Sequence, residues 1–149
     1  MSIEEDIKQR SFVSPFSKAI INIIYTNSWI GQKQNSVFRK HDLTVPQFNV
    51  LRILRGQYPN PSTVNLIIER MLDKSSNASR IVDKLVAKEY VLRKQCPSDR
   101  RAVDVFISEK GLEILKQLDE ELLQWEEGLS KLSEDEYNQL NTLLDKMRT

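Results

Sequence analysis

The stretch SRIVDKLVAKEYVLRKQCPSDRRAVDVFISEKG, residues 79–111, decides the fold, because the spacing of its apolar residues changes half-way along. Ile81, Val82 and Leu85 recur at the spacing of one helix face. YVLRKQ and AVDVFIS, by contrast, are short runs rich in β-branched and aromatic residues, and the charged run CPSDRR separates them. This pattern predicts a helix followed by a β-hairpin with a charged tip.

Helical patterns precede this stretch. A long apolar stripe predicts a first helix over about residues 9–39. Thr44 and Gln47 have the spacing of a capping box and predict a second helix over about 45–56. Ser62 is a candidate N-cap for a short third helix, STVNLIIERML, and the polar run DKSSNAS separates that helix from the fourth.

Two more helices are expected after the hairpin, because Ser108 is a candidate N-cap and Ser133 and Glu136 have the spacing of a capping box. The whole chain is then a single domain over 1–149, mainly α with a small β-hairpin, an α+β fold. A short helix, a break, a second helix and a hairpin are the layout of a winged helix-turn-helix. We assign this lobe to 43–107 and a helical dimerisation region to 9–39 and 108–149.

The composition leaves little for catalysis. The chain has one histidine, His41, one cysteine, Cys96, and four scattered glycines, so it has neither a His/Cys cluster for zinc nor a glycine-rich phosphate loop. No pair of acids lies in an apolar setting that would shift a pKa. We expect no catalytic residue, no metal site, no cofactor and no enzymatic activity.

A reducing, cytoplasmic location is expected, because a single cysteine cannot form a disulfide within the chain. The N-terminus MSIEEDIKQR is acidic where a signal peptide needs a basic stretch. The longest apolar run, residues 19–25, is short and contains Asn22, so we expect no membrane-spanning helix.

Charge is segregated along the chain although the net charge is only +1. Residues 74–101 hold eight basic and three acidic side chains, whereas residues 109–149 hold five basic and eleven acidic ones. The middle of the chain therefore attracts phosphate and the C-terminal part repels it. A solvated charged face is the alternative, but the basic stretch coincides with the expected helix-turn-helix and hairpin, which favours double-stranded DNA as the partner.

The candidate DNA contacts lie at the start of the fourth helix and at the hairpin tip. Small residues allow close approach to bases, Asn can pair with adenine, and Arg can donate two hydrogen bonds to guanine. Arg80 and Lys84 are one turn apart, so one can contact a base and the other a phosphate. The candidates are Ser75, Ser76, Asn77, Ser79, Arg80, Lys84, Asp99, Arg100 and Arg101.

Alternatives remain for several of these candidates. Ser75, Ser76 and Asn77 could simply cap the helix. At the tip, an arginine fits the electronegative minor groove, and a nearby carboxylate such as Asp99 can hold it extended; the alternative for Asp99 is an ordinary surface ion pair.

The sequence resembles the MarR family of bacterial transcriptional regulators over nearly its whole length. LTVPQFNVLRIL, SRIVDKLVAKEYVLRK and, most specifically, DRRAVDVFISEKG carry the resemblance. It implies an obligate homodimer formed by the N- and C-terminal helices, a palindromic operator, and often a small aromatic or anionic effector that releases DNA. By motif position it implies that Arg80 reads bases, that Arg101 enters the minor groove, and that Asp99 supports Arg101.

The chain departs from the family pattern at four positions. Ile68 and Leu72 replace small residues of the third helix, so we expect more open helix packing. Glu89 replaces a glycine at the end of the recognition helix, where a positive φ would cost Glu about 1 kcal/mol and could alter the turn. Cys96 lies in the wing, away from the family's peroxide-sensing position, and is expected to be a passive thiol.

An effector-binding cleft near Tyr25, Trp29 and Phe48 is expected from the resemblance, although aromatic residues at helical spacing are more often core. The apolar faces of the first and last two helices exceed what a small domain can cover, which predicts a homodimer. The leading function is a sequence-specific regulator of transcription, a homodimeric repressor released by an effector. The alternative is a helical protein-interaction module whose basic patch binds an acidic partner.

Overall fold

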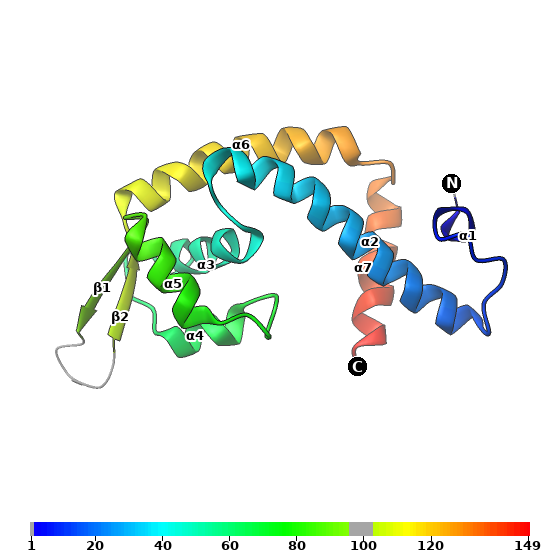
Figure 1. The fold of residues 1–149 in the computed structure, drawn as a ribbon, viewed down its shortest axis with the longest axis horizontal. Coiled ribbons are helices and arrows are strands. Elements are labelled where there is room, and N and C mark those ends of the chain that lie inside the picture. The colour runs from blue at the N-terminus through cyan, green and yellow to red at the C-terminus, as the bar shows by residue number, and fades with distance from the viewer. Residues whose placement is uncertain (1, 96–102) are drawn as a thin grey trace. The chain divides into compact units, whose positions relative to one another are not determined.

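The computed structural model describes residues 2–95 and 103–149 and contains two compact units, Met1–Leu118 and Asp119–Thr149. The elements of the chain are α1 (Ile3–Asp6), α2 (Pro15–Phe38), η1 (Arg39–His41), α3 (Val45–Arg55), α4 (Val64–Arg70), α5 (Ala78–Ala87), β1 (Val91–Gln95), β2 (Val103–Ile107), α6 (Glu109–Leu129) and α7 (Glu134–Met147), as Figure 1 shows. This order confirms the predicted mainly helical fold with one hairpin.

The start of the first long helix differs from the prediction. The helix begins at Pro15, not near residue 9, because the Ser14 hydroxyl accepts the Ser17 N–H at 3.1 Å and proline suits the first helical turn. The preceding residues include a separate short helix, α1, which Ser2 and Glu5 close with a capping box. The apolar pattern that predicted a helix from about residue 9 therefore includes residues that precede α2 and are not helical.

The start predicted for the second helix, near residue 45, is confirmed by α3. In α3 the Thr44 hydroxyl accepts the Gln47 N–H, and the Gln47 side chain accepts the Thr44 N–H at 3.1 Å. The last helix, α7, has the same arrangement between Ser133 and Glu136. Capping sequences were thus reliable markers of these helix starts.

The predicted cap of the short third helix is wrong by one residue. Thr63, not Ser62, accepts the backbone N–H of Leu66 at α4. Ser62 is buried and its backbone exchanges two hydrogen bonds with Val105, each 2.8 Å long, so it forms a bridge on the free side of β2. Ser62 is therefore committed to the sheet and cannot cap the helix.

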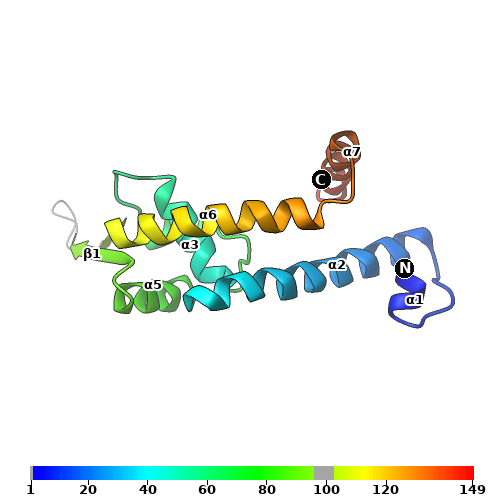
Figure 2. The same cartoon turned by 90° about the horizontal axis from the view of Figure 1, so that it is seen from above.

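The hairpin is antiparallel, with Val91 opposite Ile107 and Gln95 opposite Val103. Figure 2 shows β1 beside α5, and α2 leading away from α3 and α5. One core fills the lobe made by α3, α4, α5 and the hairpin. The adjoining helices α2 and α6 contribute to this core. Its fully buried large side chains are Phe38, Val50, Leu51, Leu54, Ile67, Val82, Leu85, Val91, Val105, Leu115 and Leu118.

Candidate nucleic-acid interface

The expected recognition helix is α5, and its burial pattern decides which of its side chains are presented outward. Ala78, Val82 and Leu85 are buried against the core. Ser79, Arg80 and Lys84 lie between these residues in the sequence and are exposed. Helical spacing therefore places the predicted polar and basic residues of α5 on its solvent face.

The start of α5 is closed by Asn77, whose side-chain oxygen accepts the Arg80 N–H at 3.0 Å. The capping role considered for this segment thus belongs to Asn77. Because its oxygen is engaged with the helix backbone, Asn77 presents its amide N–H groups outward more readily than the donor and acceptor pair that adenine requires.

The end of α5 confirms the positive φ expected at Glu89, which is 63°. The Glu89 N–H donates to Val86 at 2.9 Å and the Tyr90 N–H donates to Leu85 at 3.0 Å, which is the Schellman pattern. The turn keeps its left-handed shape without glycine. Lys110 donates to the Glu89 carboxylate at 2.9 Å and holds the pKa of that carboxyl below its usual value.

The two serines before α5 are held by Asp73, a residue that the sequence analysis did not select. Ser75 donates its hydroxyl and its N–H to one carboxylate oxygen, at 2.6 and 2.9 Å, and the Ser76 hydroxyl donates to the other at 2.9 Å. These bonds, led by that from the Ser75 hydroxyl, lower the pKa of Asp73. The Asp-x-Ser-Ser spacing was the signal that could have revealed this turn.

Several side chains of the basic stretch are engaged by partners within the lobe. Lys74 donates to the carbonyls of Ile68 and Glu69 near the end of α4. Lys88 binds the Asp42 carboxylate. These lysines stabilise local structure, so the count of basic residues overstates the charge that is available to a partner.

Arg93 connects the hairpin to the recognition helix. From β1 its guanidinium pairs with the Asp83 carboxylate on α5 and donates to the Ser79 carbonyl at 3.4 Å. This contact neutralises the acid on the exposed side of α5 and fixes β1 against the helix. Arg93 is therefore a positioning residue that sequence reasoning counted only as a charge.

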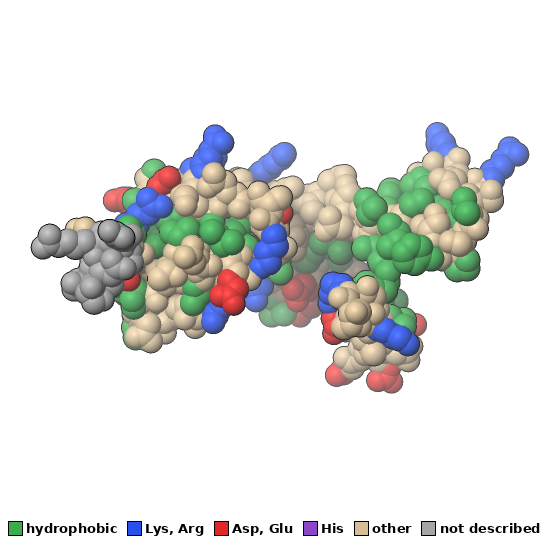
Figure 3. Space-filling view, turned by 90° about the horizontal axis from the view of Figure 1, so that it is seen from below, with side chains coloured by type: hydrophobic (Ala, Val, Ile, Leu, Met, Phe, Trp, Pro, Cys, Tyr) green, Lys and Arg blue, Asp and Glu red, His purple; other side chains and the backbone are tan. Residues whose placement is uncertain are grey.

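Arg80 and Lys84 differ from these cations, because neither makes an ion pair with another residue of the described ranges. Both line a groove of about 360 Å³ between the starts of α3 and α5. Its lining residues are Thr44, Pro46, Gln47, Ser76, Asn77, Arg80, Ile81 and Lys84. Figure 3 shows Lys and Arg side chains projecting from this lobe. The charges of Arg80 and Lys84 are therefore available to an external anion.

The hairpin-tip candidates Asp99, Arg100 and Arg101, with Cys96, lie outside the described residues. The described strands end beside each other, since Gln95 pairs with Val103. Their roles stay predictions from the sequence.

The bulky side chains of Ile68, in α4, and of Leu72, two residues after the end of α4, point outward. Ile68 is 44% exposed and Leu72 is 84% exposed, whereas Ile67 and Met71 fill the core below α4. α4 contacts both α3 and α5, so the bulky side chains do not separate these helices. The expected opening of the helix-turn-helix is therefore not needed to accommodate them.

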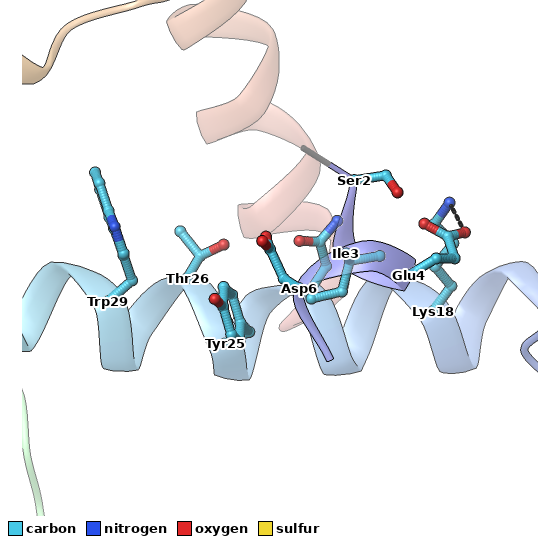
Figure 4. A pocket seen from close by; sticks show the side chains of 9 residues that line it. Ser2, Ile3, Glu4, Asp6, Lys18, Tyr25, Thr26 and Trp29 are labelled. Atoms are coloured by element: carbon cyan, nitrogen blue, oxygen red, sulfur yellow. Dashed lines mark ion pairs between the residues drawn. The ribbon is translucent and has the colours of Figure 1, made fainter. Parts of the chain in front are cut away.

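The three aromatic effector candidates do not lie together. Tyr25 and Trp29 line a pocket of about 520 Å³ between α1 and α2, where Lys18 pairs with Glu4 (Figure 4). Phe48 belongs to the core of the lobe, with its ring centroid 4.6 Å from that of Phe38. The pocket therefore offers two of the aromatics, and Phe48 supports packing.

The described residues contain no group of three or more His, Cys, Asp or Glu side chains that could bind a metal ion. Within the same ranges, no helix has the length and apolarity that crossing a bilayer needs.

Comparison with known proteins agrees with this geometry. The MarR family profile matches residues 43–103, the lobe that carries α5 and the hairpin. HTH-type transcriptional regulator MhqR of Bacillus subtilis is 31% identical over 119 residues, which cover 79% of this chain and 81% of that protein. The chain belongs to the MarR family.

Solved structures of MarR proteins share the fold. A mutant of MarR from E. coli, in complex with operator DNA, is 25% identical with a TM-score of 0.75, and the match covers 99% of each chain. The organohalide-sensing regulator RdhR, in its 2,4-dichlorophenol-bound form, has a TM-score of 0.81 at 17% identity over 94% of this chain and 85% of that chain. This MarR-family chain is a transcriptional regulator with a DNA-binding winged helix, and the acidic-protein-binding alternative is not favoured.

Proposed function

We propose that this chain is a homodimeric repressor that binds a palindromic operator through α5 and the hairpin tip and is released by a small-molecule effector. The observation that carries the DNA contact is the pair Arg80 and Lys84, exposed on α5 and unpaired within the described part of the chain. Neighbouring Asp83 is paired with Arg93, so it does not neutralise them.

The roles of the contact residues follow from their chemistry. Arg80, in the first turn of α5, donates to guanine, and Lys84, one turn later, contacts a phosphate. Ser75, Ser76, Asn77 and Ser79 complete the surface around the start of the helix. Arg101 enters the minor groove beside α5, with Asp99 supporting it, and Arg100 is a further DNA contact at the tip.

Dimerisation is supported by apolar surface in each compact unit. Hydrophobic side chains gather on the N-terminal half of α2 in Figure 3, where Phe16 and Ile24 are 70% and 63% exposed. In the second unit, Leu140 and Leu143 of α7 are exposed as well. Large contiguous apolar patches are uncommon on soluble monomers, and in our proposal a second copy of the chain covers these surfaces.

The effector site is the pocket between α1 and α2. Tyr25 and Trp29 offer aromatic surface, and Asn22 and Thr26 offer hydrogen-bonding groups. Lys18 and Glu4 also line it but pair with each other, so the charge left in the lining is that of Asp6, which disfavours an anion and favours a neutral aromatic compound. RdhR, which was solved with a dichlorophenol, supports a ligand of this class.

The decisive experiment is a binding titration on a selected operator and on random duplex. Arg80→Ala is expected to weaken operator binding by about 1–3 kcal/mol and random binding much less. Arg10→Ala, an exposed arginine outside the lobe, is the matched control and should change neither. If Arg80→Ala leaves the operator-to-random ratio unchanged, α5 does not read the sequence.

A further inference from the structure

In the turn before α5, the hydroxyl groups of Ser75 and Ser76 both donate their protons to the carboxylate of Asp73. Ser75 donates to one oxygen of Asp73 at 2.6 Å, and Ser76 donates to the other at 2.9 Å. An ionised carboxylate can only accept, so both protons belong to the serines. All three residues precede a helix whose next polar residues are the proposed DNA contacts.

A serine hydroxyl has one proton and two lone pairs. Once the proton is donated to Asp73, only the lone pairs of Ser75 and Ser76 face a partner. Phosphate oxygens offer no proton, and Asp73 adds a negative charge beside the serines, so a phosphate contact is unfavourable here. In the major groove, the base-edge groups that donate are the exocyclic amines of adenine and cytosine.

We propose that Asp73 is a specificity-determining residue that turns Ser75 and Ser76 into pure acceptors, so that they read the amino group of adenine or cytosine. The proposal rests on the proposed contact between α5 and DNA. Ser76 carries most of the effect, because it also lines the groove shared with Arg80 and Lys84. Asp73 acts through the serines as a positioning residue and does not itself touch a base.

The test begins with selection from random duplexes by the full-length protein and by Ser76→Ala. Positions whose base preference disappears in Ser76→Ala are those that Ser76 reads, and we expect adenine or cytosine there. Replacing that base with an analogue that lacks the exocyclic amine should weaken wild-type binding about fivefold, the effect of one hydrogen bond. For Asp73→Ala, whose serine hydroxyls rotate freely, the same replacement should change binding less than about twofold.

Removing Asp73 also removes a negative charge, which strengthens binding to every DNA. Glu69→Ala is the matched control, because Glu69 is an exposed acid of α4 whose side chain has no partner in the described ranges. Both variants should gain similar affinity for random duplex, but only Asp73→Ala should lose the base preference. If Asp73→Ala does not fold, Asp73→Asn, which keeps a single acceptor oxygen, should show a partial loss.

A guanine or thymine preference at the Ser76 positions would overturn the inference, as would an Asp73→Ala protein that keeps the wild-type preference. Either result leaves the proposed DNA-binding function intact, since the operator has then been selected. Failure of the wild-type protein to select any sequence would instead reject both.

Discussion

Arg80 and Lys84 lie one turn apart on α5, but they are expected to act on different parts of the DNA. A lysine is a compact point charge that suits phosphate, whereas the guanidinium fork suits the two acceptors of guanine. Their contacts distinguish these two residues from three other cations of the lobe. Lys74 binds backbone carbonyls, and Lys88 and Arg93 bind carboxylates of the same chain. Residue type alone could not make that distinction.

Lys84→Ala is expected to weaken binding to operator and to random duplex by similar factors. Losing one phosphate contact should reduce the slope of log affinity against log salt by about one unit. The measurement is a titration at several salt concentrations, with Lys131→Ala, an exposed lysine outside the lobe, as control. A Lys84→Ala protein that loses affinity only for the operator would show that Lys84 reads a base.

Glu89→Gly is expected to stabilise the protein. The left-handed backbone at this position, with φ of 63°, costs a residue with a Cβ about 1 kcal/mol, and glycine removes that strain. The exposed ion pair with Lys110 contributes less than the strain. Chemical denaturation should therefore show a higher midpoint for Glu89→Gly and a lower one for Glu89→Ala, which loses the ion pair and keeps the strain.

At the level of elements, helix starts were predictable where a polar side chain closes the first turn, as at Thr44 and Ser133. The start of the first long helix was predicted too early, because the helical spacing of apolar residues extends N-terminal to the helix. The true start is set by Ser14, which caps α2, and by Pro15 in its first turn. Ser62 was misassigned because its commitment to Val105 is a contact between residues distant in sequence. Such contacts cannot be read from local patterns.

Gly111 packs the first turn of α6 against Tyr90, which precedes β1, and against Ile107 of β2, and a side chain cannot be accommodated there. A Cβ would lie 2.3 Å from the Tyr90 carbonyl oxygen and 2.8 Å from the Ile107 side chain. Gly111→Ala is therefore expected to destabilise the protein by about 1–3 kcal/mol in denaturant unfolding. Gly128→Ala, later in the same helix with no atom within 4 Å of its Cβ, should be neutral or stabilising by up to about 1 kcal/mol. Equal effects of the two changes would contradict this packing.

At the level of the whole molecule, the family could be predicted from the hairpin and recognition-helix motifs, and the comparisons confirm it. The exposed polar face of α5, where we propose the DNA contact, also followed from helical spacing, because buried Val82 and Leu85 fix the orientation of α5. The Asp73 turn and the Arg93 contact could not be assigned in the same way. Both depend on side-chain hydrogen bonds whose partners are set by the folded geometry.

The protein is expected to be a dimer at micromolar concentration, with α7 contributing to the interface. Leu143 is 61% exposed, so Leu143→Glu should place a charge in the interface and shift the protein to monomer in light scattering. Asn141→Glu, exposed on the same helix but two residues before Leu143 and so on its other side, adds the same charge and should remain dimeric. A wild-type protein that is monomeric under these conditions would reject the dimer.

Operator spacing tests the dimer and the DNA contact together. Two copies of α5 can enter successive major grooves on one face of the duplex when the half-sites are about one helical turn, roughly 10 base pairs, apart. Inserting about five base pairs rotates one half-site to the opposite face, so affinity should fall to the level of a single half-site. Inserting about ten base pairs restores the face and is the matched control, with partial recovery expected if the dimer can span the longer distance. Because Leu143→Glu is expected to bind as a monomer, its affinity should be insensitive to either insertion. A wild-type protein equally insensitive to the five-base-pair insertion would show that each half-site is bound independently, whatever the oligomeric state in solution.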